Sequence, residues 1–231
     1  MRFFHYKFLA QIFSYPDLTL DERVKVVINK LSSGYKYSKA VINLKKFHKL
    51  LPCKNLSAME ELYTRSFDVQ SATTLDIGYI LFSDDYKRGE MLVLLNQECK
   101  KAKVNCGCEL SDHLPNILKL ITASKDQKFL NELVKIFLAP ALREMIKEFD
   151  LNRLKKREEF YKKQYKTLID LDSDIDRAIL YSYALKSVYS VLEVDFDVSV
   201  EKQTVCSSDF LSSLKREFDT EDNQENVNST V

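Results

Sequence analysis

The stretch DIDRAILYSYALKSVYSVLE, residues 174–193, decides the fold class. Its apolar residues recur at helical spacing along one face: Ile175, Ile179, Leu180, Ala184, Val188 and Leu192. A repeat of this kind forms a continuous apolar stripe on an α-helix, and such a stripe has to be buried against other elements. We therefore predict that this helix lies at the centre of a helical bundle.

Working outward from this stretch, helical periodicity covers most of the chain. The expected helices span residues 4–13, 21–31, 38–51, 57–67, 73–82, 86–104, 115–122, 126–138, 140–149 and 151–169. Ser57 and Glu60 form a capping box, which predicts a helix start, and Asp84 or Asp85 is expected to cap the long helix that follows. Residues 73–82, TTLDIGYILF, have strand-forming residues, but a lone strand has nothing to pair with, so we expect a buried helix.

The composition agrees with one all-α domain. Among 231 residues 45% are hydrophobic and 30% charged, which supports a continuous core, and only 4 Gly and 4 Pro leave few turn-formers for an all-β protein. We predict a single-domain helical bundle of about 9–11 helices over residues 1–198. Residues 199–231 end in KREFDTEDNQENVNSTV, which is acidic and amide-rich, so a disordered tail is expected there.

Charge and hydropathy exclude several classes. The formal net charge is +1, so no electrostatic footprint for nucleic acid is expected. No run of 18 apolar residues is present, and His5, Tyr6, Lys7 and Gln11 interrupt any signal-peptide core, so we expect neither membrane insertion nor export. Five cysteines without regular spacing do not make a disulfide framework, and a cytoplasmic location is the expectation.

Residues 106–117, CGCELSDHLPNI, contain the side chains best suited to metal binding. Cys99, Cys106, Cys108 and His113 are zinc-ligand types, but their C-x6-C-x-C-x4-H spacing is not a usual structural zinc pattern. A cysteine inside an amphipathic helix, as at position 99, is more often a small core residue. We therefore predict no metal site and keep a metal-binding helical enzyme as an alternative.

An acid/base site would use Glu109, Asp112 and His113. These residue types transfer protons, but they are equally common at helix starts, where acidic groups cap the first turn. The sequence has no Walker loop, G-x-G-x-x-G, G-x-S-x-G or H-E-x-x-H motif. We predict no catalytic residues, no cofactor and no enzyme activity.

The proline at position 115 shapes the segment instead. A residue before proline is pushed out of the helical region, and proline itself suits the first position of a helix. Glu109 to His113 are therefore expected to form an ordered turn that leads onto a helix N-terminus. That turn would bring carboxylates, an imidazole and free backbone N–H groups close together.

Three motifs between Glu61 and Ile121 resemble one protein family in order and spacing. They are YTRSFD at residues 63–68, KRG at 87–89 and ELSDHLP at 109–115. They are similar to the Y-x-x-x-F-[DE] segment, the Arg-Gly pair and the E-L-P-D-H-L-P signature of cytoplasmic chaperones that mature molybdenum-containing oxidoreductases. The match is to the nitrate reductase delta-subunit, or NarJ-like, branch of the TorD-like family. Ser111 departs from the signature, because it stands where the family has proline.

The N-terminal LAQIFSYPD, residues 9–17, also resembles that family's opening helix and Tyr-Pro turn. The resemblance implies an all-helical chaperone that binds the N-terminal leader of an apo molybdoenzyme catalytic subunit and keeps that subunit ready for molybdopterin insertion. Nitrate reductase and nitrite oxidoreductase are examples of such clients. The implied partner is that subunit, and the chaperone is expected to be a monomer or a homodimer. No bound guanine nucleotide is predicted, because the sequence shows no phosphate-binding loop.

The resemblance also implies a groove for an amphipathic peptide, with aromatic walls and a polar rim. The expected peptide-binding residues are Tyr63, Phe67, Asp68, Tyr79, Arg88, Gly89, Glu109, Leu110, Asp112, His113, Leu114 and Pro115, with Phe82 as a further aromatic candidate. A helical scaffolding or regulatory protein without a molybdoenzyme client has the same composition and is the alternative.

Overall fold

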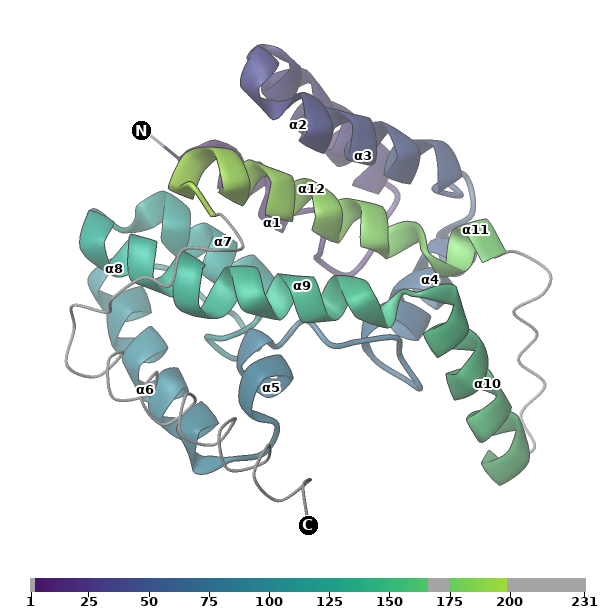
Figure 1. Cartoon of the computed structure of the whole chain (residues 1–231). Coiled ribbons are helices and arrows are strands. Elements are labelled where there is room, and N and C mark those ends of the chain that lie inside the picture. Colours follow the sequence, from purple (N-terminus) through teal and green to yellow (C-terminus); the bar gives the residue numbers. More distant parts are fainter. Residues whose placement is uncertain (1–2, 166–174, 199–231) are drawn as a thin grey trace, which may run out of the picture.

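The computed structural model describes residues 3–165 and 175–198. Within these residues the chain is all-α, as predicted, with no strand and with twelve α-helices, several of them short, in one bundle (Figure 1). No helix in the described ranges is long and apolar enough to cross a membrane. The predicted disordered tail, residues 199–231, lies outside the described residues.

The first half of the chain forms the helices α1 (His5–Ala10), α2 (Leu20–Ser32), α3 (Ser38–Leu50), α4 (Leu56–Phe67), α5 (Ile77–Phe82) and α6 (Tyr86–Lys101), with the 3-10 turn η1 (Tyr35–Tyr37) between α2 and α3. The second half forms α7 (Leu114–Ala123), α8 (Gln127–Glu132), the π-helix η2 (Leu133–Leu138), α9 (Ala139–Glu148), α10 (Leu151–Tyr165), α11 (Ile175–Ala178) and α12 (Leu180–Phe196).

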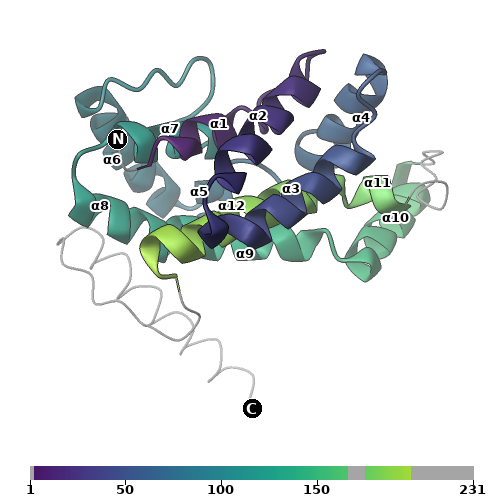
Figure 2. The same cartoon turned by 90° about the horizontal axis from the view of Figure 1, so that it is seen from above.

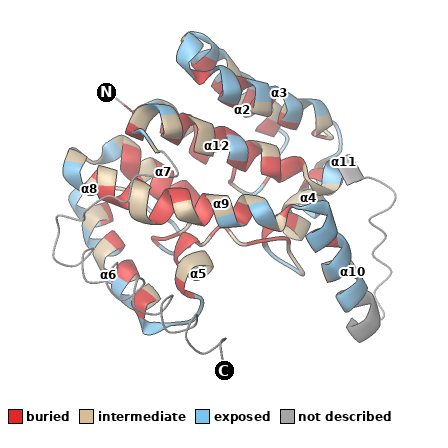
Figure 3. Ribbon diagram, viewed as in Figure 1, coloured by how far each residue is buried: buried red, intermediate tan, exposed pale blue. Residues whose placement is uncertain are grey.

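Helix α12 lies at the centre of the bundle, as its apolar stripe predicts. It packs against α3 on one side and α9 on the other (Figures 1 and 2). Leu180, Ala184, Val188 and Leu192 are all buried, and each large aliphatic side chain of this kind stabilises the fold by about 1.5–3 kcal/mol. The described side chains of α10 are mainly exposed instead, so this helix projects from the bundle (Figure 3).

Helix α4 begins one residue before the position that the capping box predicts. Asn55 is the N-cap, and its side-chain oxygen accepts a hydrogen bond of 3.0 Å from the Ala58 backbone N–H. Ser57 lies inside the first turn, so the prediction that Ser57 caps this helix was wrong. Asn and Ser cap helices about equally well, and the extended backbone of Asn55 decides between them.

Residues 73–82 are not one buried helix. Only Ile77–Phe82 is helical, and Asp76 just before it is extended and forms an isolated antiparallel bridge with His113. The Ile77 N–H donates to the Asp112 carbonyl at 3.1 Å, and the Leu114 N–H donates to the Leu75 carbonyl at 2.8 Å. The strand-like residues therefore do find a partner, which lies far away in the sequence.

The predicted break before Pro140 is absent. Helix α8, η2 and α9 follow one another without a gap, so Pro140 lies within a continuous helical segment. Proline lacks the backbone N–H that an α-helix interior needs, and the wider π turns just before it accommodate that loss. Two other helix starts agree with the sequence prediction. Asp85 caps α6 and Asp126 caps α8, each through its side chain.

Candidate functional site

A cleft of about 480 Å³ opens between the turn after α1, helix α4 and the loop that precedes α7. Six of the predicted peptide-binding residues line it: Tyr63, Phe67, Asp68, Glu109, His113 and Pro115. They come from two of the three family-like motifs, which are some forty residues apart in the sequence. The fold therefore brings the first and third motifs to one place.

The other six predicted residues do not line the cleft. Leu114 is fully buried in the core, and Asp112, in the loop before α7, is also fully buried. The side chain of Arg88 pairs with Asp112 and is mostly buried. Tyr79 and Leu110 are exposed elsewhere on the surface, and Gly89 is exposed with open space around it. The aromatic candidate Phe82 is buried, with its ring 6.2 Å from that of Phe137.

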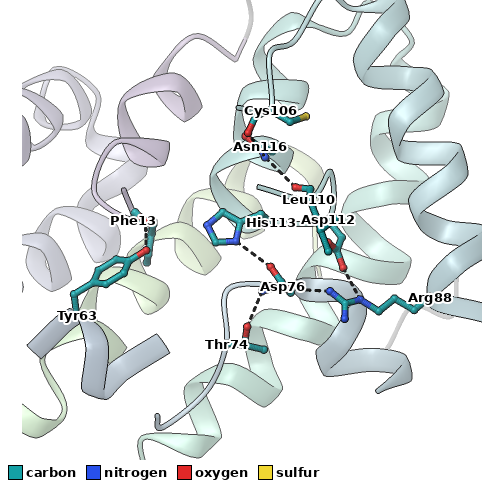
Figure 4. A network of polar contacts seen from close by, with 10 residues as sticks. All are labelled: Phe13, Tyr63, Thr74, Asp76, Arg88, Cys106, Leu110, Asp112, His113 and Asn116. Atoms are coloured by element: carbon teal, nitrogen blue, oxygen red, sulfur yellow. Dashed lines mark hydrogen bonds and ion pairs between the residues drawn. The ribbon is translucent and has the colours of Figure 1, made fainter. Parts of the chain in front are cut away.

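The bridge between Asp76 and His113 joins the segment before α5 to the loop before α7 on one side of the cleft. Because their backbones pair, their side chains lie together, and His113 Nδ1 is 3.0 Å from Asp76 Oδ1 (Figure 4). His113 is the extended N-cap residue of α7, and the helix begins at Leu114. The expectation that Pro115 keeps Leu114 out of the helix and is itself the first helical residue was therefore wrong by one position. Asp76 was not predicted as a site residue.

Arg88 joins Asp76 to the buried carboxylate of Asp112. Its Nη2 lies 3.0 Å from Asp76 Oδ2 and its Nε lies 3.1 Å from Asp112 Oδ2 (Figure 4). The guanidinium also lies over the Tyr79 ring, 5.4 Å from its centroid. Arg88 therefore supports the cleft from behind and is not part of its lining.

The two carboxylates have opposite pKa shifts. Burial raises the pKa of Asp112, although Arg88 opposes this, and Asp112 Oδ1 is buried without a hydrogen-bond partner among the described residues. The hydrogen bond from His113 is the main cause that lowers the pKa of Asp76, and Arg88 adds to it. Asp76 is thus held as an anion at the floor of the cleft.

Hydrogen bonds fix the loop before α7. The buried Asn116 donates through Nδ2 to the carbonyls of Leu110 at 2.9 Å and Cys106 at 3.2 Å. Its Oδ1 accepts from Lys119 Nζ at 3.1 Å. The buried Ser111 donates from Oγ to the Leu92 carbonyl at 3.3 Å, so the residue that departs from the family signature ties the loop to α6.

Aromatic rings form the opposite wall. The Tyr63 hydroxyl donates to the Phe13 carbonyl at 3.1 Å, and its ring meets those of Tyr15 and Phe67 edge to face, with centroids 5.4 Å apart in each case. Burial raises the pKa of Tyr63, and the carboxylates of Glu109 and Asp68 raise it further. The cleft thus has an aromatic wall beside acidic groups.

The zinc-ligand types around position 106 do not converge. No three of Cys99, Cys106, Cys108 and His113 form a group with ligand atoms within 4.8 Å of one another. Cys99 is buried in α6, and burial raises the pKa of its thiol to about 12, which makes it a poor ligand. The acid/base group does not converge in the cleft either, because Asp112 lies outside the cleft lining.

Sequence reasoning missed nine of the fifteen described residues that line the cleft, and it also missed Gly78 behind it. Asp76 and Lys119 line the cleft, Asn116 holds its loop, and Gly78 makes room for Asp112. Asp76 lies among strand-forming residues, and this was the sequence feature that could have identified it. Its backbone pairs with that of His113, in the segment before Pro115. Nothing in the local sequence marks Asn116 or Lys119, because their partners are fixed only by the fold.

Comparisons with known proteins find no relative, since no family model, no curated protein and no solved structure matches the chain. The function is therefore inferred from the geometry of the cleft and from the motifs that line it.

Proposed function

We propose that this chain is a cytoplasmic chaperone of the NarJ-like kind. It binds the N-terminal leader of the apo catalytic subunit of a molybdenum-containing oxidoreductase, such as a nitrate reductase or a nitrite oxidoreductase. It then holds that subunit competent for molybdopterin insertion and assembly. The chaperone itself performs no catalysis in this proposal.

One observation carries the proposal. The two segments that resemble the family's motifs, residues 63–68 and 109–115, line the same cleft. A coincidental match of two short motifs would not require them to meet in space. Their meeting supports a shared role for both segments in binding.

The cleft has the chemistry that a leader peptide would use. Its volume of about 480 Å³ is within the range of protein ligand sites but holds only a few side chains, so it suits an anchor segment of a peptide. The rings of Tyr63 and Phe67 offer apolar contact, while His113, Asp76 and Lys119 offer polar contacts. An amphipathic helix that inserts one face would use both kinds of contact.

Co-purification tests this proposal directly. The tagged chain is expressed in its own cells, and the proteins that it retains are identified by mass spectrometry. We expect a large molybdopterin-binding catalytic subunit that lacks its cofactor. If no such subunit is recovered while the enzyme is being made, the proposal is contradicted, and a scaffolding role with other partners takes its place.

Two variants decide whether the cleft is the surface that binds the catalytic subunit. Tyr63→Ala removes an aromatic wall of the cleft and is expected to abolish recovery of the subunit. Tyr79→Ala removes an equally large aromatic residue that is exposed outside the cleft, and recovery is expected to persist. The reverse pattern would place the binding surface at α5 and not at the cleft.

A further inference from the structure

A second cluster of reactive side chains lies where α2, α3 and the turn after α3 meet. Asp21, His48 and Cys53 each offer one potential ligand atom, and these three atoms lie within 4.8 Å of one another. No other group of three His, Cys, Asp or Glu residues in the described ranges meets this criterion. The cluster shares no residue with the cleft lining.

The side chains of His48 and Cys53 both contact one carboxylate oxygen of Asp21. His48 Nε2 lies 2.5 Å from Asp21 Oδ1, and the Cys53 thiol donates to the same oxygen at 3.2 Å. The side chains of Asp21 and His48 are 21% and 30% exposed, so the cluster is partly buried but open to an ion from solvent. The three potential ligand atoms, one nitrogen, one sulfur and one oxygen, therefore lie next to one another.

Each residue is positioned by a different element. Asp21 is the second residue of α2, and His48 lies in the last turn of α3. Cys53 follows Pro52 in a tight turn, where its backbone N–H donates to the Leu51 carbonyl at 2.9 Å. The cluster therefore depends on the packing of α2 on α3, and no local sequence motif reveals it.

We propose that Asp21, His48 and Cys53 form a binding site for a divalent transition-metal ion of the zinc type, with a fourth position open to water. Carboxylate oxygen, imidazole nitrogen and thiolate sulfur are the three ligand types that zinc takes in proteins. Three protein ligands with one open position are typical of zinc sites that accept a further ligand.

The spacing fits with little movement. Zinc bonds of about 2.0–2.3 Å in tetrahedral geometry place ligand atoms roughly 3.3–3.8 Å apart. The oxygen-to-sulfur distance is already 3.2 Å, and the oxygen-to-nitrogen distance of 2.5 Å has to widen by about 1 Å. Rotations about the torsions of these partly buried side chains supply such a change without moving a helix.

The charge balance also favours a divalent ion. Lys25 donates a hydrogen bond to Asp21, which is the charge-assisted contact of a lysine with a carboxylate. A bound divalent ion replaces the thiol proton, and the carboxylate and thiolate together then neutralise it. Lys25 contacts the other oxygen, Oδ2, at 2.5 Å, and its side chain is 55% exposed, so it can turn away into solvent.

A bound ion would join α2 to the end of α3 and to the turn that leads into α4. Helix α4 carries Tyr63 and Phe67, so the ion would steady one wall of the cleft. This role adds to the proposed function but does not depend on it, because the three ligands alone define the site.

Metal binding to the full chain tests the proposal. Chelator-treated protein is titrated with Co²⁺, which reports a thiolate ligand through its charge-transfer absorption, and with Zn²⁺ in competition. We expect about one equivalent of either ion and a thiolate-to-cobalt band. Cys53→Ser should abolish the band, and His48→Ala should weaken affinity by more than about tenfold, since even outer partners of metal ligands change affinity roughly 10- to 100-fold.

Cys108→Ser and Cys206→Ser are the matched controls, and both should bind like the wild type. Cys108 is exposed away from the cluster, and Cys206 lies outside the described residues. The absence of a cobalt band in the wild type would overturn the proposal. Binding that survives Cys53→Ser, or that is lost in either control, would also overturn it by placing the ion elsewhere.

A measurement on the wild type avoids any folding defect of the variants. Zinc should slow the alkylation of Cys53 by iodoacetamide, mapped by mass spectrometry, and leave the alkylation of Cys108 unchanged. Equal rates for Cys53 with and without zinc would contradict the site.

Discussion

Gly78 leaves the space that the Asp112 carboxylate occupies. A β-carbon at position 78 would lie 2.6 Å from Asp112 Oδ2, which is too close for any side chain, and 3.3 Å from Arg88 Cγ, which is a tight contact. Asp112 is fully buried and paired with Arg88, so it has little freedom to move away. The ion pair behind the cleft therefore requires a glycine on α5.

Gly78→Ala should destabilise the protein. The added methyl group displaces the Asp112–Arg88 pair, and overpacking of this kind costs about 1–3 kcal/mol in the free energy of unfolding. The control is Gly89→Ala in α6, where a β-carbon meets nothing within 4 Å. That exposed helical change should stabilise by roughly 0.5–1 kcal/mol. Urea denaturation measures the free energy of unfolding of both variants. An equal effect of the two substitutions would contradict the steric clash at position 78.

Arg88→Ala should cost far more than the loss of a surface ion pair. It leaves the buried Asp112 carboxylate uncompensated, which destabilises proteins by about 3–5 kcal/mol. Arg65→Ala is the control, because the Arg65–Glu61 pair is exposed and one turn apart on α4, a contact worth about 0.3–0.5 kcal/mol. Thermal and urea unfolding compare the two, and similar losses would mean that Asp112 is not held by Arg88.

Asp112 also affects how stability depends on pH. The folded-state pKa values of Asp76, Asp21 and Asp195 are lowered, so their contributions are present at neutral pH and are lost as pH falls below about 4 toward 2. The pKa of Asp112 is raised, so its contribution has the opposite sign and weakens the fold as pH rises above about 4.

Asp112→Asn removes that opposing contribution. The free energy of unfolding of the variant should therefore rise more steeply with pH than that of the wild type, just above pH ~4. Chemical denaturation at a series of pH values measures both slopes. A shallower slope in the variant would show that the carboxylate at position 112 is not destabilised by burial.

The buried amide of Asn116 should control the shape of the cleft. Asn116→Ala leaves the Leu110 and Cys106 carbonyls without this donor, and a lost buried partner costs about 1–3 kcal/mol. Asn96→Ala on the exposed face of α6 is the control and should change stability by less than about 0.5 kcal/mol. Hydrogen exchange of the loop at residues 106–113 reports the local effect. Unchanged protection in Asn116→Ala would show that the loop is held by other contacts.

Sequence periodicity predicted the elements whose burial is encoded locally. The stripe from Leu180 to Leu192 identified α12 as central, because a helix buries its apolar face at spacings visible in a few turns. Asp84 or Asp85, and Asp126, were expected at helix starts for the same local reason, and the structure has Asp85 and Asp126 as the caps. The error at residues 73–76 arose because the bridge partner of Asp76, His113, lies far away in the sequence. The error at Pro140 arose because π turns precede it in a continuous helical segment.

The site was predictable only in part. Tyr63, Phe67, Asp68, Glu109, His113 and Pro115 were named from motifs and do line the cleft. Asp112 and Arg88 were expected at a polar rim, but a carboxylate and a guanidinium can equally pair inside the fold, and sequence spacing does not distinguish the two places. Asp76 escaped notice because its partner His113 lies 37 residues away.

The most direct test of the central claim is the affinity of the cleft for a leader peptide. A fluorescent peptide with the N-terminal sequence of the co-purified subunit is titrated with the wild type, His113→Ala and Leu110→Ala, and anisotropy gives each Kd. The His113 side chain makes no capping hydrogen bond to α7, so its loss should leave the helical circular dichroism unchanged. Leu110 is in the same loop but exposed outside the cleft.

We expect His113→Ala to raise Kd by at least about tenfold, which corresponds to roughly 1.4 kcal/mol, and Leu110→Ala to leave it unchanged. Equal affinities of wild type and His113→Ala would contradict the claim that this cleft captures the leader.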